Sequence, residues 1–164
     1  MRDLAWWLDN FERSAFRLET LPEYNVPQEA EWLEAFKRDG SLPRLSPEND
    51  SWLKLVSSCG SQRKQLQRVR IVRHPLSDYL RFELALFQAS VASGEEIRVT
   101  TEHRFGCGDF WLFDSHTVIL LRYDTAGRFL ETEQPEDSVP YCRIRDLALE
   151  RSIPLGQYLA RATR

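Results

Sequence analysis

The sequence is poor in the residues that build the common disulfide, cofactor and metal sites. Its 164 residues include three cysteines, three histidines and seven glycines. Cys59, Cys107 and Cys142 are an odd number at wide spacing, so we expect free thiols rather than a disulfide framework. The segment Gly106-Cys-Gly108 lacks the third glycine and the following helix of a phosphate-binding loop. The sequence therefore predicts no cofactor.

Long apolar runs and complete sets of metal ligands are also missing. No run of 18 apolar residues occurs, so we expect no membrane-spanning helix. The first residues lack the parts of a secretory signal peptide, which are a basic region followed by an apolar one and a small-residue cleavage site. We therefore expect the protein in the cytoplasm. His103 and Cys107 have a metal-like spacing, but no second pair of ligands completes a tetrahedral set. We therefore expect no metal site.

The composition is that of an ordered chain with one core. Hydrophobic residues make up 42% and aromatic residues 12%, and the formal net charge is only -3. We expect a single domain over 1–164, with an N-terminal helical and strand annex at 1–60 and a core at 66–164. Six basic and no acidic residues fall in 51–77, whereas acids concentrate in 19–34 and 131–137. These patches either neutralise each other in the fold or steer a charged partner to one face.

The stretch 68–87 organises the expected fold. It has the pattern of a buried strand, a polar turn and an apolar helix, and a second strand follows at 96–101, which indicates a βαβ unit with a parallel strand pair. Residues 109–133 contain two turn signals between aromatic and β-branched runs and predict a three-stranded antiparallel meander. A short strand is expected at 16–21, and helices are expected at 3–14, 27–38, 47–58, 139–151 and 154–162. The fold class is α/β (α+β), with a mixed sheet flanked by helices.

Glu83 is the most informative residue for function. It lies inside the apolar arc of the predicted helix at 77–94, where a lone carboxylate is costly to bury. Arg70 and Arg73 on the preceding strand are its expected partners, because the crossover brings the helix back over that strand. One interpretation is a structural ion pair or an exposed rim. The other is a charged ligand pocket at the carboxyl end of the strand, formed by Arg70, Arg73, Asp78, Arg81 and Glu83.

Four further residues have both a chemical and a structural interpretation. His74, which follows the strand and precedes a proline, is a candidate acid, base or phosphate contact, or simply a turn histidine. Asp109 and Asp114 bracket an apolar strand, where they could coordinate Mg²⁺, orient a water or cap the backbone. Trp111 could stack on a nucleic-acid base or belong to the core. Because no helix pair carries a basic second helix, we do not expect direct nucleic-acid binding.

Five blocks of the sequence carry a family resemblance. Residues 16–19, 24–27, 75–83, 92–98 and 109–114 resemble the signature blocks of a family of uncharacterised actinobacterial domains. This resemblance implies genes that sit beside Xre-type helix-turn-helix regulators, and hence an accessory or effector role. A weaker similarity in fold is to half of a phospholipase D-like domain. That superfamily needs a His-x-Lys motif, and none of the three histidines has a lysine two positions on, so such a scaffold would be catalytically inert.

Two functions follow from these observations. The favoured function is that of a non-catalytic binding or regulatory domain. Its expected partner is a protein, a helix-turn-helix regulator, and a small acidic ligand is a second candidate for what it binds. The alternative is a phosphodiesterase or nuclease-type toxin in which His74 and Glu83 are catalytic. Missing catalytic constellations and the segregated charge favour binding. The candidate binding residues are Arg70, Arg73, His74, Asp78, Arg81, Glu83, Asp109, Trp111 and Asp114.

Overall fold

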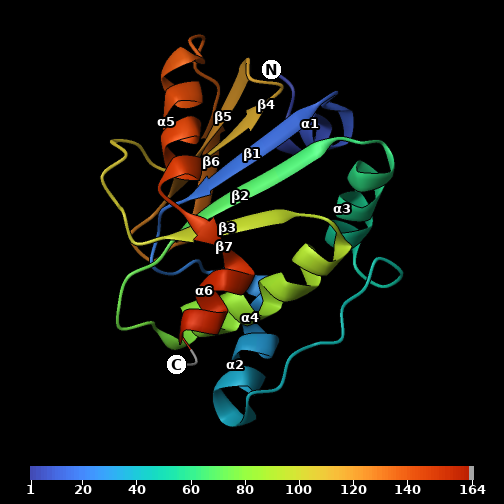
Figure 1. Cartoon of the computed structure of the whole chain (residues 1–164), viewed down its shortest axis with the longest axis vertical. Coiled ribbons are helices and arrows are strands. Elements are labelled where there is room, and N and C mark those ends of the chain that lie inside the picture. The colour runs from blue at the N-terminus through green and yellow to red at the C-terminus, as the bar shows by residue number, and fades with distance from the viewer. Residues whose placement is uncertain (163–164) are drawn as a thin grey trace.

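The computed structural model describes residues 1–162, which are built around one mixed sheet (Figure 1). Within these residues the strand order is β6-β5-β4-β1-β2-β3-β7. Strands β1, β2 and β3 are parallel to one another, and all other neighbouring pairs are antiparallel. The predicted fold class, the βαβ unit and the meander are confirmed. The strands are β1 (Ser14–Glu19), β2 (Gln65–Ile71), β3 (Glu96–Thr100), β4 (Phe110–Phe113), β5 (Thr117–Tyr123), β6 (Phe129–Glu133) and β7 (Ile153–Pro154).

Helices cover both faces of the sheet. In Figure 1, α5 lies on one side of the strands, and α2, α4 and α6 lie together on the other. Within residues 1–162, no helix has both the length and the apolar character needed to cross a membrane. The helices are α1 (Leu4–Asn10), the 3₁₀ turn η1 (Pro27–Glu29), α2 (Ala30–Asp39), α3 (Ser51–Ser61), α4 (Asp78–Ser93), α5 (Val139–Glu150) and α6 (Leu155–Ala162).

The ends of the helices follow from capping. The sequence offers Ser77 or Asp78 as the N-cap of α4 and Gly94 as its end. The Ser77 hydroxyl is the cap, since it accepts a hydrogen bond from the Leu80 N–H, and Gly94 ends the helix at φ 121°. The expected helix start at residues 46–47 is wrong. Residues 47–49 form a turn, and α3 begins after Asp50, whose carboxylate accepts from the Leu53 N–H.

Strand β1 occupies the middle of the sheet. It pairs in parallel with β2 on one side and antiparallel with β4 on the other, and Leu18 is fully buried. The register places Arg17 opposite both Arg68 and Trp111, and Glu19 opposite Arg70. Residues 1–60 therefore contribute a central strand as well as surrounding helices.

The two faces of the central strands differ in chemistry. Alternate residues of a strand point to opposite faces, so Phe16, Leu18, Val69 and Ile71 face α5 together with residues of β4 and β5. The residues in between, which are arginines and a glutamate on β1 and β2, point to the side of α4. A polar layer therefore lies between the sheet and α4, where an apolar layer would be usual.

Candidate functional site

A layer of buried charge lies between the sheet and α4. Strands β1 and β2 supply its floor through three arginines and a glutamate, and α4 and the segments next to β3 and β4 supply the other acids. Arg70 is fully buried, and Glu83 and Asp109 are 5% and 3% exposed. We call this set the buried charge layer; its members are Arg17, Glu19, Arg68, Arg70, Glu83, Glu95 and Asp109.

Arg70 and Glu83 form the ion pair that the crossover predicts. Arg70 Nε lies 2.8 Å from Glu83 Oε1, and the guanidinium also donates to the carbonyl oxygens of Leu21 and Ile71 at 2.6 and 3.1 Å. The Tyr24 ring lies over the same guanidinium, 5.0 Å away. The hydrogen-bonding capacity of Arg70 is thus taken up inside the protein.

Glu19 lies between two arginines at the end of β1. Its carboxylate is 2.5 Å from Arg68 Nη1 and 3.8 Å from Arg70 Nε. Arg68 also binds Glu95 at 2.7 Å. Burial alone would raise the pKa of Glu19, but Arg68, Arg17 and Arg70 together lower it to about 2. Glu19 is therefore ionised in the folded protein.

Glu83 differs from Glu19 in its protonation. Burial raises the pKa of Glu83 to about 7, and the negative charge of Glu19 adds to this, whereas Arg70 acts in the opposite direction. A count of charges agrees, because the buried charge layer holds four carboxyl groups but only the guanidinium groups of three arginines. One carboxyl group is in excess, which agrees with the raised pKa of Glu83.

Asp109 and Asp114 fix the two ends of β1. Asp109 accepts hydrogen bonds from Arg17, from the N–H and hydroxyl of Thr20, and from the Tyr24 hydroxyl, at distances between 2.5 and 2.9 Å. Asp114 accepts from the backbone N–H groups of residues 12, 13 and 14. Of the expected alternatives, backbone and side-chain capping is the one observed. Within residues 1–162, no group of three or more His, Cys, Asp or Glu side chains is arranged to hold a metal ion.

A pocket opens above the buried charge layer. It has a volume of about 450 Å³ and reaches Arg17, Glu19, Arg68 and Glu83 at its floor. Its walls are aromatic and come from Tyr24, Tyr79, Phe87, Tyr123 and Phe129. We call it the inner pocket.

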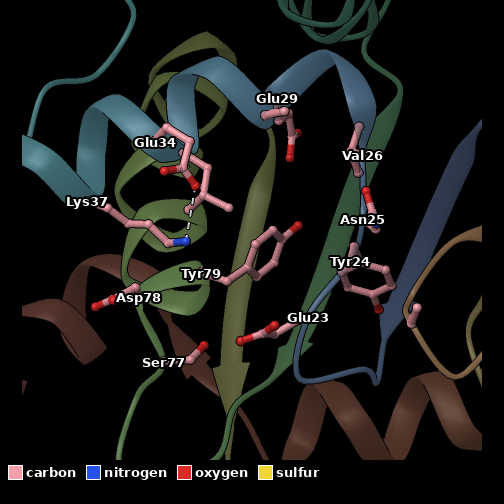
Figure 2. A pocket seen from close by; sticks show the side chains of 13 residues that line it. Glu23, Tyr24, Asn25, Val26, Glu29, Glu34, Lys37, Ser77, Asp78 and Tyr79 are labelled. Carbon is pink, nitrogen blue, oxygen red and sulfur yellow. Dashed lines mark hydrogen bonds and ion pairs between the residues drawn. The ribbon is translucent and has the colours of Figure 1, made fainter.

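A second cavity adjoins the inner pocket on the side of α2. This outer pocket has a volume of about 570 Å³ and lies between the segment 23–26, the first turns of α2 and the start of α4 (Figure 2). The two pockets share Tyr24, Asn25, Val26, Glu29 and Tyr79. In Figure 2, the carboxylate of Glu29 and the hydroxyl of Tyr79 point toward one another across the cavity.

The outer pocket is acidic. Its lining includes Glu23, Glu29, Glu34 and Asp78, and the one cationic residue, Lys37, is paired with Glu34 at 3.2 Å. Burial raises the pKa of Glu29, and the nearby Glu19 raises it further. Within residues 1–162 Glu29 has no ion-pair partner within 4.0 Å, so its charge is met only by more distant groups. An arrangement of this kind favours a positively charged or proton-donating guest.

The expected site residues do not form one cluster. Arg70, Glu83 and Asp109 belong to the buried charge layer, and Asp78 lines the outer pocket. Arg73 is exposed and does not pair with Glu83, because it lies beyond the end of β2, whereas Arg70 faces α4. The remaining residues lie elsewhere.

His74, Arg81 and Trp111 lie outside both pockets. His74 is exposed and its Nε2 is 3.2 Å from the Tyr158 hydroxyl, in a separate cavity. Arg81 forms an exposed ion pair with Asp78 at 3.1 Å. Trp111 is buried in an apolar cluster and stacks on Phe113 with ring centroids 5.7 Å apart, so it belongs to the core.

The sequence analysis did not identify four of the seven members of the buried charge layer, which are Arg17, Glu19, Arg68 and Glu95. Arg17 and Glu19 lie in the region of the short strand expected at 16–21, but that pattern does not show that they are buried. The signal that identifies them is the alternation Phe16-Arg-Leu-Glu19 in a strand that is paired on both sides, since every residue of such a strand is covered. The aromatic walls Tyr24 and Tyr79 carry no comparable signal in the sequence.

The comparisons with known proteins identify a family but no activity. No curated protein matches the chain. The predicted membership of a family without a known function is confirmed, whereas the neighbouring helix-turn-helix regulator and the phospholipase D-like likeness stay predictions. Since the model for the domain of unknown function DUF6879 matches residues 2–160, nearly the whole chain, the protein belongs to that family.

Proposed function

We propose that the protein is a non-catalytic binding domain that takes up a cationic group of a partner in the outer pocket. The observation that carries this proposal is the composition of the outer pocket, in which four carboxyl groups face one lysine that is already paired. An ammonium or guanidinium group entering there would neutralise Glu29, which has no ion-pair partner among residues 1–162, and would lie beside Asp78, which already pairs with Arg81 at 3.1 Å. Such a group is found on lysine and arginine side chains and on small organic amines.

The walls of the outer pocket suit the same guest. The rings of Tyr24 and Tyr79 lie 6.4 Å apart at the boundary of the two pockets. A cation beside an aromatic face gains about 0.5–1 kcal/mol when exposed and about 2 kcal/mol when desolvated. Carboxylates and phenol rings together therefore favour an amine or guanidinium over a neutral polar group.

The inner pocket does not offer free positive charge. Arg17, Arg68 and Arg70 each lie within 3.0 Å of a carboxyl group, and Arg70 also lies 3.8 Å from the ionised Glu19. A phosphate or carboxylate ligand would have to displace one of these internal acids, which would leave a buried charge unpaired. A small acidic ligand therefore fits poorly in the buried charge layer.

A protein partner with a basic surface is consistent with this chemistry. The resemblance described above implies a helix-turn-helix regulator, and proteins of that class carry arginine and lysine on the surface that contacts DNA. A basic side chain of such a partner, held in the outer pocket, would couple this domain to the regulator. This is the accessory role that we propose.

The enzymatic alternative lacks an assembled site. It requires His74 beside Glu83, yet His74 lines the cavity next to Tyr158, while Glu83 lies in the inner pocket against Arg70. General acid–base catalysis requires both groups within hydrogen-bond reach of one substrate. The geometry therefore favours binding.

The test is a titration of the full chain with N-acetyl-arginine amide, N-acetyl-lysine amide and the uncharged analogue N-acetyl-citrulline amide, followed by ¹⁵N NMR. We expect saturable shifts at residues 24–34 and 77–79 with the two cations and none with the citrulline compound. Glu29→Gln should weaken binding about tenfold, the effect of losing one charge-assisted contact. Glu150→Gln, an exposed glutamate on α5, is the matched control and should leave the affinity unchanged. Equal binding of all three compounds, or equal effects of the two variants, would overturn the proposal.

Co-purification tests the partner separately. The protein carrying an affinity tag is expressed with any helix-turn-helix regulator that a neighbouring gene encodes. Complex formation is then compared between the unmodified chain and Asp78→Asn combined with Glu29→Gln. A stable complex that the double variant loses supports the regulatory role. Repeated failure to find any complex would remove that role, whatever the small-molecule titration shows.

A further inference from the structure

A third pocket lies beyond the carboxyl ends of β2 and β3. It has a volume of about 410 Å³ and shares no lining residue with the inner or outer pocket. His74 enters it from the segment after β2, Arg151 from the turn after α5, and Tyr158 and Arg161 from α6. In open α/β sheets, ligands bind outside the carboxyl ends of the parallel strands.

The third pocket is basic. Arg151 and Arg161 line it together with the His74 imidazole, and none of its described lining residues is acidic. Glu102, which is not one of the lining residues, accepts from Arg151 Nη1 at 3.3 Å and from the backbone N–H groups of residues 103 and 104. In the part of the chain that the structure describes, no ion-pair partner lies within 4.0 Å of Arg161.

The donors of the third pocket converge from separate elements. Tyr158 and Arg161 are three residues apart on α6, so both side chains lie on the same face of that helix. The Tyr158 hydroxyl lies 3.2 Å from His74 Nε2, which links α6 to the segment after β2. An arginine, an imidazole and a phenol hydroxyl therefore border one space, and all three can donate hydrogen bonds to oxygen.

An apolar wall completes the pocket. Val99, which is 2% exposed, and the partly buried Ile153 lie beside the Tyr158 ring. Pockets that hold small organic molecules combine such apolar surface with a few convergent polar groups. A guest that fills this space would have an apolar or aromatic body and one anionic end.

We propose that the third pocket binds a small organic oxyanion, a phosphomonoester or a carboxylate, through Arg161, Arg151 and His74. The body of the guest lies against Val99, Ile153 and Tyr158. This site is separate from the acidic outer pocket in position and opposite to it in charge preference. It therefore stands whether or not the outer pocket binds a cation.

The test is a titration of the full chain with phenyl phosphate, followed by ¹⁵N NMR and by the imidazole resonances of His74. We expect saturable shifts at residues 73–74, 99–101 and 151–161, and no response to the neutral analogue benzyl alcohol. Arg161→Gln and His74→Gln should each weaken binding about tenfold, the effect of losing one hydrogen bond to a charged group. Arg143→Gln, an exposed arginine on α5, removes the same charge elsewhere and should leave the affinity unchanged.

Two more probes identify the guest. Benzoate that binds as tightly as phenyl phosphate assigns a carboxylate, and benzoate that binds at least tenfold more weakly assigns a phosphomonoester. Inorganic phosphate that binds as tightly as phenyl phosphate would overturn the role of the apolar wall. Absence of saturable shifts, or equal weakening by Arg143→Gln and Arg161→Gln, would overturn the site itself. Thermal unfolding of each variant confirms that the exposed substitutions leave the fold intact.

Discussion

Replacing Glu83 with glutamine tests the protonation that we assign to the buried charge layer. Glutamine has nearly the same shape as a protonated glutamate but cannot ionise. In the folded protein the Glu83 carboxyl group holds its proton up to about pH 7, whereas in the unfolded chain it loses the proton near its ordinary pKa of 4.5. Between these two pH values the folded state binds more protons, so raising the pH favours unfolding.

The size of the effect follows from the two pKa values of Glu83. From 4.5 to about 7, at about 1.4 kcal/mol per pH unit, the free energy of unfolding falls by about 3 kcal/mol because of this group. The contribution of Glu83 to the free energy of unfolding is fully present below pH 4.5 and is lost by about pH 8. Glu83→Gln lacks this loss. Relative to the unmodified protein, the variant should therefore gain about 3 kcal/mol between about pH 4 and about pH 8.

Urea denaturation at a series of pH values measures this difference directly. The matched control is Glu150→Gln, which makes the same chemical change at an exposed position and should run parallel to the unmodified protein at every pH. Glu19→Gln removes the neighbouring charge, so it should flatten the same pH dependence, and it should also cost about 3–5 kcal/mol because Arg68 and Arg70 lose a buried partner. Parallel pH profiles for Glu83→Gln and the unmodified protein would refute the reasoning. A ¹³C titration that places the Glu83 carboxyl group at or below 4.5 would do the same.

Two further substitutions test how the site is held in place. Asp109→Asn should lower the free energy of unfolding by about 3–5 kcal/mol, because it leaves Arg17 buried without its acid, whereas Asp124→Asn at an exposed turn should cost about 1 kcal/mol or less. Equal costs in urea denaturation would contradict the buried pairing. Gly127→Ala and Gly106→Ala introduce a similar backbone strain of about 1 kcal/mol, because φ is 75° at Gly127 and 72° at Gly106. The two positions differ in space, since the new Cβ at Gly127 would lie 2.6 Å from the backbone oxygen of residue 23, whereas no atom lies within 4 Å at Gly106. We expect Gly127→Ala to cost about 2 kcal/mol more in thermal or urea unfolding, and similar values for both would exclude the close approach as the reason for this glycine.

Periodic patterns in the sequence predicted the local structure well. The turn signals between β4, β5 and β6 and the capped apolar helix α4 depend on residues close in the chain, and both elements are present as expected. The pairing of Arg70 with Glu83 could also be predicted, since a crossover connects their two elements directly. These successes share one property, which is that the decisive partners lie within about one supersecondary unit.

The position of β1 could not be predicted from local patterns. Its partners on β2 and β4 are separated from it by long stretches of chain, and nothing near residue 17 indicates them. For that reason Arg17 and Glu19 were missed. Trp111 was ambiguous for a related reason, because an aromatic residue on a strand has the same pattern whether it is covered by helices or open to solvent. The aromatic walls of the two pockets depend on how loops 20–29 and 124–128 meet, and no sequence period encodes that contact.

The insertion of β1 between β2 and β4 has a consequence for how binding competence arises during folding. Strand β1 emerges first from the ribosome but acquires both neighbours only after residue 113 has been made. Glu19 can meet Arg68 and Arg70 as soon as β2 has been made, but Arg17 gains its acid only with Asp109. A shortened chain that ends before residue 109 therefore has an open sheet and leaves Arg17 without its partner. The outer pocket is also lined by residues from 23 to 126, so it is complete only after β5 has been made. Binding of a cation there, as proposed above, would therefore report completed assembly of the sheet rather than of any one segment.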